Sequence, residues 1–279
     1  MALRPADAFD PALEQRVISA LVLAAGALVA VLVGGWLFTT VVLAAVVVMA
    51  GEWSRLLPPV VGSDPRKLTM AVTVLAAGGA ILALEGAGRP DLALAAVLLG
   101  ALLAAAGAAL MPGFPPDRVA GGVVYIGLPA LAVVWLRGHV PGGLEHVLWL
   151  LLVVWATDVC AYVAGRTVGG PKLAPRISPS KTWAGLVGGM IGAALVGGLA
   201  AMEFGAGFWL GAGLGPVMAL AAQTGDLFES ALKRRAGLKD SGHLIPGHGG
   251  LLDRVDGLVF AAPLFAALVW LLGRATAAP

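Results

Sequence analysis

The chain has 279 residues, of which 59% are hydrophobic and only 12% are charged, with a formal net charge of +2 and a mean hydropathy of +0.92. This composition excludes an ordinary water-soluble domain, because one core of this size cannot bury so much apolar surface, and it predicts a polytopic membrane protein. The single cysteine, Cys160, excludes an internal disulfide, and one thiol with four histidines makes no zinc pattern. We expect Cys160 to pack as a small buried hydrophobe.

Apolar stretches separated by Gly and Pro clusters predict an all-α fold, a polytopic bundle of about nine transmembrane helices. We treat residues 1–279 as a single integral membrane domain, in which the helices of residues 1–143 precede a more polar group at residues 144–279. The polar N-terminus leads directly into the first span, which predicts a retained anchor and not a cleaved signal peptide. The expected spans are 17–34, 36–57, 67–85, 91–111, 119–137, 144–165, 183–202, 207–229 and 255–273.

The basic residues predict the orientation of the bundle. With the N-terminus inside, all but three of the 18 lysines and arginines fall on the cytoplasmic side, and the exceptions are Arg89, Arg137 and Arg274. This asymmetry follows the positive-inside rule, and an odd number of spans leaves the C-terminus outside. We therefore expect a multi-pass protein of the cytoplasmic (inner) membrane.

Residues within the spans indicate how the helices pack. Gly188 and Gly192 have the small-xxx-small spacing that lets two helices approach closely, which favours packing within the bundle, with dimerisation as the alternative. Glu52, near the cytoplasmic end of the second span, is interpreted as reaching the interface or pairing with Arg55, and not as a substrate contact.

The first polar cluster lies between residues 225 and 257. Asp226, Glu229 and Lys233 share one helix face at i, i+3 and i+7, where the eighth span leaves the membrane. A glycine-rich turn follows, and Asp253 and Asp256 stand one turn apart at the start of the ninth span. In so apolar a chain a cluster of charged residues near the bilayer is a candidate functional site.

The residue types in this cluster indicate a chemistry. Helix capping would explain either aspartate alone, but not the basic run and the glycine turn between two acidic pairs. Oxygen ligands without thiolates indicate Mg²⁺, which proteins usually hold with one or two carboxylates plus substrate phosphates. Lysines and arginines neutralise phosphate oxygens, and glycine amides let a polyphosphate approach the backbone. The combination predicts phosphoryl or nucleotidyl transfer.

A second polar cluster runs from Asp158 through the glycines and basic residues of 165–176 to the segment SPSKTWAG at 178–185. The stretch GRTVGGPK is not a P-loop, because Pro171 occupies the place of the P-loop lysine and no Ser or Thr follows Lys172. The hydroxyls of 178–182 are expected to cap the seventh span, and Lys181 to hold an anion there.

The segment 230–256, SALKRRAGLKDSGHLIPGHGGLLDRVD, closely resembles the signature of the phosphatidate cytidylyltransferases, or CDP-diacylglycerol synthases. The segment 158–185 also resembles this family, so the resemblance covers the C-terminal half, whereas the N-terminal half is similar only in having several hydrophobic spans. Ala184 departs from the family, whose members often carry Glu or Gln there, and it weakens any role at that position. The matching residues are Ser230, Lys233, Arg234, Lys239, Asp240, Pro246, His248, Gly249, Gly250, Asp253, Arg254 and Asp256.

The resemblance implies transfer of CMP from CTP to phosphatidic acid, giving CDP-diacylglycerol and pyrophosphate. The helices of residues 144–279 would then carry the active site, on the cytoplasmic side. The expected cofactor is Mg²⁺, alone or with a second, monovalent cation, and the expected metal ligands are Asp226, Asp253, Asp256 and Glu229. The expected catalytic residues are Asp226, Asp253, Lys233, Lys239 and Arg254, and the expected substrate-binding residues are Lys181, Ser178, Thr182, Arg234, His248, Gly249, Gly250 and Asp158.

The expected partners are CTP, phosphatidic acid and membrane lipids, with no nucleic acid, and the resemblance implies a homodimer. Another CTP-dependent membrane lipid transferase, a polyprenol kinase or a CDP-archaeol synthase, is the alternative. The aspartate-rich pattern of the CDP-alcohol phosphotransferases does not occur in the sequence. A transporter is disfavoured, because only Asp158 and Asp226 approach the middle of the membrane.

Overall fold

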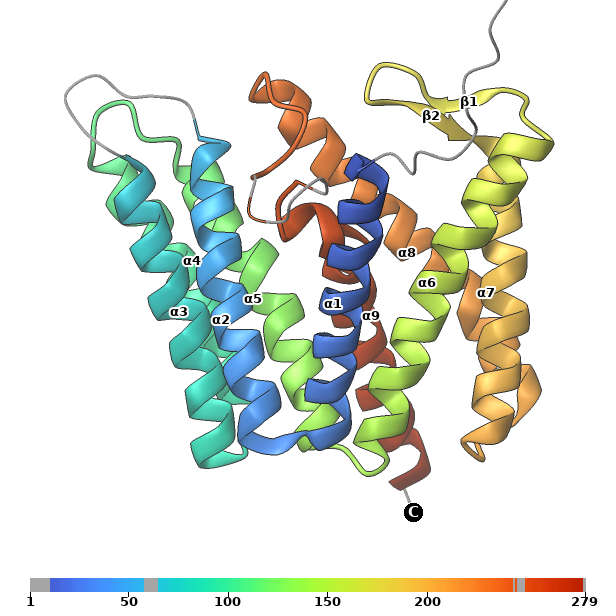
Figure 1. The fold of residues 1–279 in the computed structure, drawn as a ribbon. Coiled ribbons are helices and arrows are strands. Elements are labelled where there is room, and N and C mark those ends of the chain that lie inside the picture. Colours follow the sequence, from blue (N-terminus) through green and yellow to red (C-terminus); the bar gives the residue numbers. More distant parts are fainter. Residues whose placement is uncertain (1–10, 58–64, 243, 245–248, 278–279) are drawn as a thin grey trace, which may run out of the picture.

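The computed structural model describes residues 11–57, 65–242, 244 and 249–277, which form nine helices and one two-stranded sheet (Figure 1). The expected substrate-binding residue His248 lies outside the described residues. The elements are α1 (Pro11–Val33), α2 (Gly35–Arg55), α3 (Pro65–Ala87), α4 (Pro90–Ala109), α5 (Pro116–Gly138), α6 (Gly143–Thr167), β1 (Lys172–Ala174), β2 (Ser178–Thr182), α7 (Trp183–Glu203), α8 (Phe208–Arg235) and α9 (Leu252–Ala277).

The predicted membrane helix bundle is confirmed. Seven of the helices, α2 to α7 and α9, are long and apolar enough to cross a membrane. The helix α8 is not among them, because glycines, Pro216 and Gln223 interrupt its apolar residues, and its last turns are charged. In α1 the apolar part within the described residues is Leu21–Val33. The protein is therefore a multi-pass membrane protein.

The helix α5 joins the two halves of the bundle. It packs against α2, α3 and α4 on the N-terminal side and against α6 and α9 on the C-terminal side. Its most apolar window is 67% buried, against 28–39% for the other six candidate spans, which leave more of their surface for lipid. The core of the bundle thus lies around α5.

A short β-hairpin connects α6 to α7, where the sequence predicted only a loop and a helix cap. Gly169 and Gly170 turn the chain with φ of 68° and 88°, a region that L side chains rarely adopt. β1 and β2 then pair antiparallel, with Lys172 opposite Thr182. The predicted cap is confirmed at Thr182, whose Oγ1 accepts a hydrogen bond of 3.0 Å from the backbone N–H of Gly185.

Small residues bring α6, α7 and α8 into close contact. A Cβ at Gly188 would overlap the Cβ of Ala164, and one at Gly192 would overlap the Sγ of Cys160, so α7 packs directly on α6. The interpretation of Gly188 and Gly192 as bundle-packing residues is confirmed. Cys160 packs against α7 as a small side chain, and it is partly buried.

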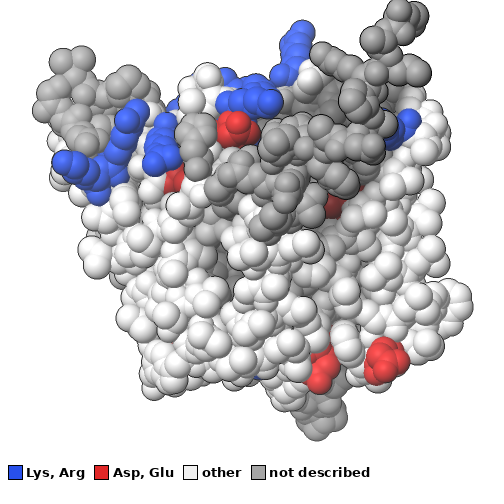
Figure 2. All heavy atoms as spheres, viewed as in Figure 1, with Lys and Arg blue, Asp and Glu red and all other residues white. Residues whose placement is uncertain are grey.

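Most of the lysines and arginines lie at one end of the bundle. Figure 2 shows the lysines and arginines at the end where the hairpin and the end of α8 lie, while the flank below carries little charge. The α3–α4 connection, which holds Arg89, and the last turn of α5, which holds Arg137, lie at the opposite end (Figure 1). This is the separation of basic residues on which the predicted orientation rests.

The Gly192→Ala substitution is expected to lower the free energy of unfolding by about 1–3 kcal/mol, because the added methyl group overlaps Cys160. The matched control is Gly213→Ala in α8, where a Cβ meets nothing within 4 Å. Thermal unfolding in detergent measures both, and the double substitution Gly192→Ala with Cys160→Ala should recover part of the loss. Equal unfolding temperatures for the two single variants would contradict the packing.

Candidate active site

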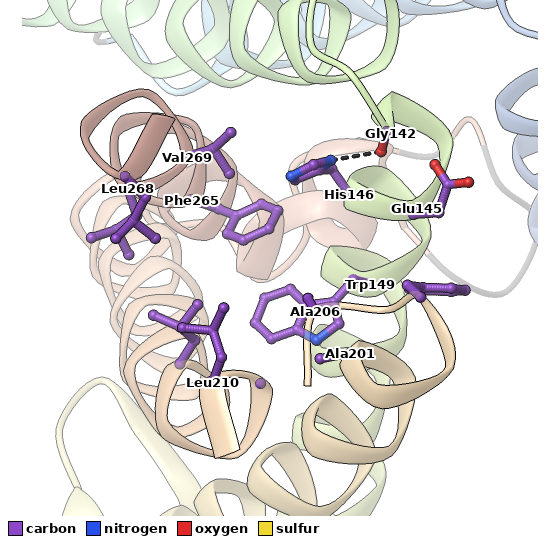
Figure 3. Close-up of a pocket in the computed structure, with 14 residues that line it drawn as sticks. Gly142, Glu145, His146, Trp149, Ala201, Ala206, Leu210, Phe265, Leu268 and Val269 are labelled. Atoms are coloured by element: carbon purple, nitrogen blue, oxygen red, sulfur yellow. Dashed lines mark hydrogen bonds between the residues drawn. The ribbon is translucent and has the colours of Figure 1, made fainter. Parts of the chain in front are cut away.

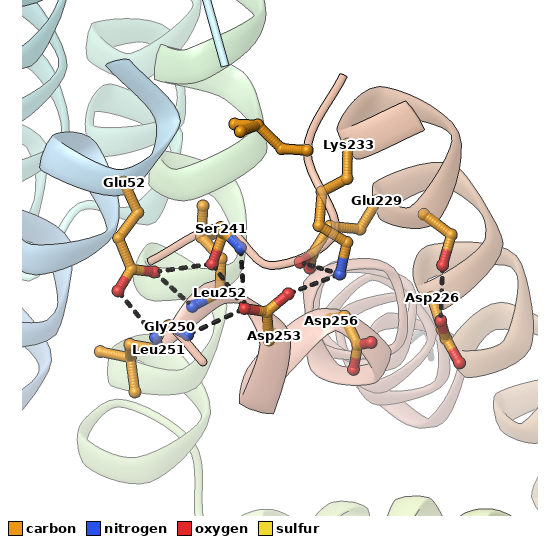
Figure 4. A network of polar contacts seen from close by, with 12 residues as sticks. Glu52, Asp226, Glu229, Lys233, Ser241, Gly250, Leu251, Leu252, Asp253 and Asp256 are labelled. Carbon is orange, nitrogen blue, oxygen red and sulfur yellow. Dashed lines mark hydrogen bonds and ion pairs between the residues drawn. The ribbon is translucent and has the colours of Figure 1, made fainter. Parts of the chain in front are cut away.

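The charged residues of α8 and α9 meet where α8 ends and α9 begins, at the basic end of the bundle (Figure 4). Asp253 is the centre of this cluster. Its Oδ1 pairs with the Nζ of Lys233 at 2.5 Å, and its Oδ2 accepts hydrogen bonds from the backbone N–H of Ser241 (2.9 Å), the Oγ of Ser241 (2.9 Å) and the backbone N–H of Gly250 (2.8 Å). The side chain of Asp253 is only 6% exposed, so these donors replace the water that the carboxylate loses on burial.

Lys233 contacts a second carboxylate on its own helix. Its Nζ lies 3.1 Å from the Oε1 of Glu229, a residue with no exposed surface. Neither oxygen of Glu229 has a hydrogen bond within the described part of the chain, so the ion pair is its compensation for burial. Lys233 lies in the last turns of α8, beyond the apolar part. Burial, the largest effect, lowers its pKa, but the two carboxylates outweigh burial and the pKa is raised.

A separate polar pocket lies between α6, the hairpin and α8. Its volume is about 520 Å³, and one wall carries Lys181 and Asp226, which form an ion pair. The Nζ of Lys181 also donates a hydrogen bond of 2.8 Å to the Oε1 of Gln223, and the Oγ of Ser230 donates one of 3.3 Å to Asp226. The predicted residues Asp158, Lys181, Thr182 and Asp226 thus line one pocket.

Sequence reasoning missed Gln223 in this pocket and assigned no individual role to three other residues that line it. Gln223 is only 7% exposed and fixes the ammonium group of Lys181, although no charge or motif marks it in the sequence. Arg166 donates a hydrogen bond of 2.8 Å to the hydroxyl of Tyr162, and both residues line the pocket with Lys172. The basic residues of 165–172 were part of the second polar cluster, so the cluster itself was the available signal.

Whether a metal ion fits this polar pocket depends on the carboxylates in it and beside it. Asp158 of α6 and Asp226 of α8 line the pocket together. A Cβ at Gly225 would overlap the carbonyl oxygen of Asp256, so α9 packs directly on α8 at the residue next to Asp226. No group of three acidic, histidine or cysteine side chains among the described residues is already arranged as a metal site. Since Mg²⁺ needs only one or two protein carboxylates besides substrate phosphates, the oxygen donors fit it, and the metal stays a prediction.

The glycine turn before α9 contacts the carboxylate of Asp253. Gly249 has a φ of 83°, and a Cβ there would lie 2.7 Å from the Oδ2 of Asp253. Gly250 donates its N–H to the same oxygen. The sequence predicted that these glycines expose backbone amides, and the amide of Gly250 is directed at Asp253.

Some predicted residues do not line the polar pocket. Arg234 is exposed and donates a hydrogen bond of 3.1 Å to the carbonyl oxygen of Leu238, at the end of its own helix. Lys239 and Arg254 are exposed as well, and Ser178 lies in β2 opposite Ala174. Their predicted roles toward substrate remain predictions.

Another pocket, of about 320 Å³, lies at the opposite end of the bundle between α6, α9 and the connection of α7 to α8 (Figure 3). Its walls are mostly apolar, with the rings of Trp149 and Phe265 stacked at 4.8 Å. The Nδ1 of His146 lies 2.6 Å from the carbonyl oxygen of Gly142, with which it forms a hydrogen bond. None of the predicted site residues lines this pocket.

Comparison with known proteins identifies the family. The model of the cytidylyltransferase family matches residues 14–272, which includes the N-terminal half. The chain belongs to this family. A phosphatidate cytidylyltransferase of Brucella suis biovar 1 (strain 1330) and one of Brucella melitensis biotype 1 are each 40% identical to it over 271 residues, 96% of this chain and 95% of the relative. A phosphatidate cytidylyltransferase of Staphylococcus saprophyticus is 41% identical over 150 residues, 53% of this chain and 56% of the relative.

The structure corrects the interpretation of Glu52 in this cytidylyltransferase. Glu52 is only 4% exposed, and it accepts hydrogen bonds from Ser241, Leu251 and Leu252. It therefore does not reach the interface, and among the described residues it has no ion pair with Arg55. A single acidic residue in an otherwise apolar span was the signal that could have marked it as a functional candidate.

The Lys233→Met substitution is expected to lower the free energy of unfolding by about 3–5 kcal/mol, because it leaves two buried carboxylates without their shared cation. The control is Arg235→Met, which removes an exposed cation from the same turn. Adding Glu229→Gln to Lys233→Met should recover part of the loss. Thermal unfolding in detergent measures all three, and equal losses in the two single variants would contradict a buried ion pair.

Proposed function

We propose that this cytidylyltransferase transfers CMP from CTP to phosphatidic acid, giving CDP-diacylglycerol and pyrophosphate. The observation that carries the proposal is the polar pocket bounded by the Lys181–Asp226 ion pair, at the basic end of a membrane bundle. Phosphatidate cytidylyltransferases are the named relatives that match 96% of the chain. A pocket at the end of a membrane helix bundle suits a reaction between a water-soluble nucleotide and a membrane lipid.

The proposed reaction is an attack by a phosphate oxygen of phosphatidic acid on the α-phosphorus of CTP. A new P–O bond forms, the bond between the α-phosphorus and the bridging oxygen breaks, and pyrophosphate leaves. The attacking phosphate is already ionised at neutral pH, so the reaction needs no strong general base. The protein's contribution is to position the phosphates and neutralise their charge. The side chains proposed for this role are Lys181, Lys233, Arg234, Lys239 and Arg254, with the hydroxyls of Ser178 and Thr182.

Mg²⁺ is the proposed cofactor, alone or with a monovalent cation as a second ion. When bound, Mg²⁺ would neutralise charge on the phosphate oxygens and on the leaving pyrophosphate. Asp226 and Asp253 are the proposed ligands, with Asp256 and Glu229 as the next carboxylates. A metal ion at either ligand would replace the lysine that now pairs with it, Lys181 at Asp226 and Lys233 at Asp253. The support is the packing of Asp256 against Gly225, the residue before Asp226, and the oxygen chemistry of the whole set.

An apolar cavity beside the charged cluster supports a lipid substrate. Its volume is about 330 Å³, it lies between α5, α8 and α9, and Tyr125, Phe228 and Phe260 line it. Phe228 immediately precedes Glu229, so acyl chains in this cavity would bring a lipid phosphate toward the carboxylates and lysines. The cytoplasmic side of the inner membrane is the proposed location of the site, with the N-terminus inside, and the homodimer stays a prediction.

The test of the proposed function is turnover by the detergent-purified chain with CTP, Mg²⁺ and phosphatidic acid. Pyrophosphate release and formation of the liponucleotide are expected, and Asp226→Asn should reduce the rate at least 100-fold, because it removes the charge that pairs with Lys181. The matched control is Glu145→Gln, at the pocket of the opposite end, which should stay within about twofold of the native rate.

An isoprenol offered in place of phosphatidic acid separates the alternatives. A polyprenol kinase would transfer the terminal phosphoryl group of CTP and release CDP, not pyrophosphate. Release of CDP with the isoprenol, or no turnover with either lipid, would overturn the assignment to phosphatidic acid.

A further inference from the structure

Glu52 connects the N-terminal half of the bundle to the charged cluster (Figure 4). It lies near the end of α2, and its Oε1 accepts a hydrogen bond of 2.8 Å from the backbone N–H of Leu251. Its Oε2 accepts hydrogen bonds from the backbone N–H of Leu252 (2.8 Å) and from the Oγ of Ser241 (3.1 Å). One buried carboxylate thus binds three donors that lie about 190–200 positions away in the sequence.

Two of these donors belong to the start of α9. The first backbone N–H groups of a helix have no partner within the helix, and here Glu52 accepts from Leu251 and from Leu252, the first residue of α9. A negative charge at this end is also favoured by the helix dipole. Asp253 is the next residue, so the position of Glu52 decides where the first turn of α9 places Asp253.

The third donor links Glu52 directly to Asp253. The Oγ of Ser241 lies 3.1 Å from the Oε2 of Glu52 and 2.9 Å from the Oδ2 of Asp253, so this hydroxyl group bridges the two carboxylates. The loop backbone is packed against Glu52 as well. A Cβ at Gly242 would lie 2.8 Å from its Oε1, and one at Gly250 would lie 2.6 Å from its Cδ.

We propose that Glu52 is a positioning residue for the nucleotidyl transfer. It holds the first turn of α9 and the loop at Ser241, and so orients Asp253 toward Lys233. Glu52 lines neither the polar pocket nor the apolar cavity between α5, α8 and α9, which places its effect on the orientation of Asp253 and not on substrate contact. The catalytic consequence rests on the proposed function, whereas the anchoring of α9 does not.

The test compares Glu52→Gln with Glu85→Gln. The amide NH₂ group that replaces one carboxylate oxygen of Glu52 cannot accept a hydrogen bond, so at least one N–H of the loop faces another donor. We expect the kcat of Glu52→Gln to fall at least tenfold, with the KM for CTP within about threefold of the native value. Glu85 is the matched control, since it accepts a hydrogen bond of 2.6 Å from Thr39 of α2 at the other end of the bundle, and its variant should keep the native kcat.

Hydrogen exchange gives a readout that does not depend on activity. The amide hydrogens of Leu251 and Leu252 are bound to Glu52, so we expect them to exchange at least tenfold faster in Glu52→Gln and at the native rate in Glu85→Gln. Unchanged exchange would overturn the anchoring. Faster exchange with an unchanged kcat would overturn the positioning role.

Failure of the positioning role can be distinguished from failure of the proposed function. If the native protein does not turn over CTP and phosphatidic acid, the proposed function and the catalytic role of Glu52 are both overturned. Hydrogen exchange still tests whether Glu52 anchors the start of α9. If Glu52→Gln does not fold, kcat and hydrogen exchange are measured on Glu52→Asp instead. It keeps two acceptor oxygens on a shorter side chain, so intermediate losses of kcat and protection support the proposal and native values overturn it.

Discussion

The ion pair between Lys233 and Asp253 is the contact on which the charged cluster depends. In a chain with 12% charged residues, carboxylates at the boundary of the bundle are stable only when other groups replace their water. Lys233 compensates both Asp253 and Glu229, and the loop supplies Asp253 with three more donors. This pairing joins the end of α8, the glycine turn and the start of α9 into one unit.

Helix packing brings a second charged pair to the same end of the bundle. Gly188 and Gly192 let α7 lie directly on α6, and Thr182 caps α7 at the end of the hairpin. The hairpin then holds Lys181 against Asp226 of α8, with Gln223 as the second partner of the lysine. Lys181 and Lys233 are thus each paired with a carboxylate, and an anionic substrate would compete with that carboxylate for the same cation.

Much of the fold followed from the sequence, because the lengths of apolar segments and the Gly and Pro residues between them depend on local properties. The cap at Thr182 and the packing of Gly192 were likewise predictable from spacing. The hairpin was not, since its strands are three and five residues long and show no alternation of apolar residues. Glu52 was misinterpreted because its nearest cation in the sequence is Arg55, whereas its true partners are backbone amides about 200 positions away.

Binding of the nucleotide in the polar pocket at Lys181 and Asp226 underlies the proposed reaction, and calorimetric titration of CTP in the presence of Mg²⁺ and the absence of lipid tests it. We expect Lys181→Met to weaken CTP binding at least tenfold, because the pocket loses the cation that would pair with a phosphate. The control His146→Ala, at the apolar pocket of the opposite end, should leave the affinity unchanged. Native affinity for CTP in Lys181→Met would contradict nucleotide binding in the polar pocket.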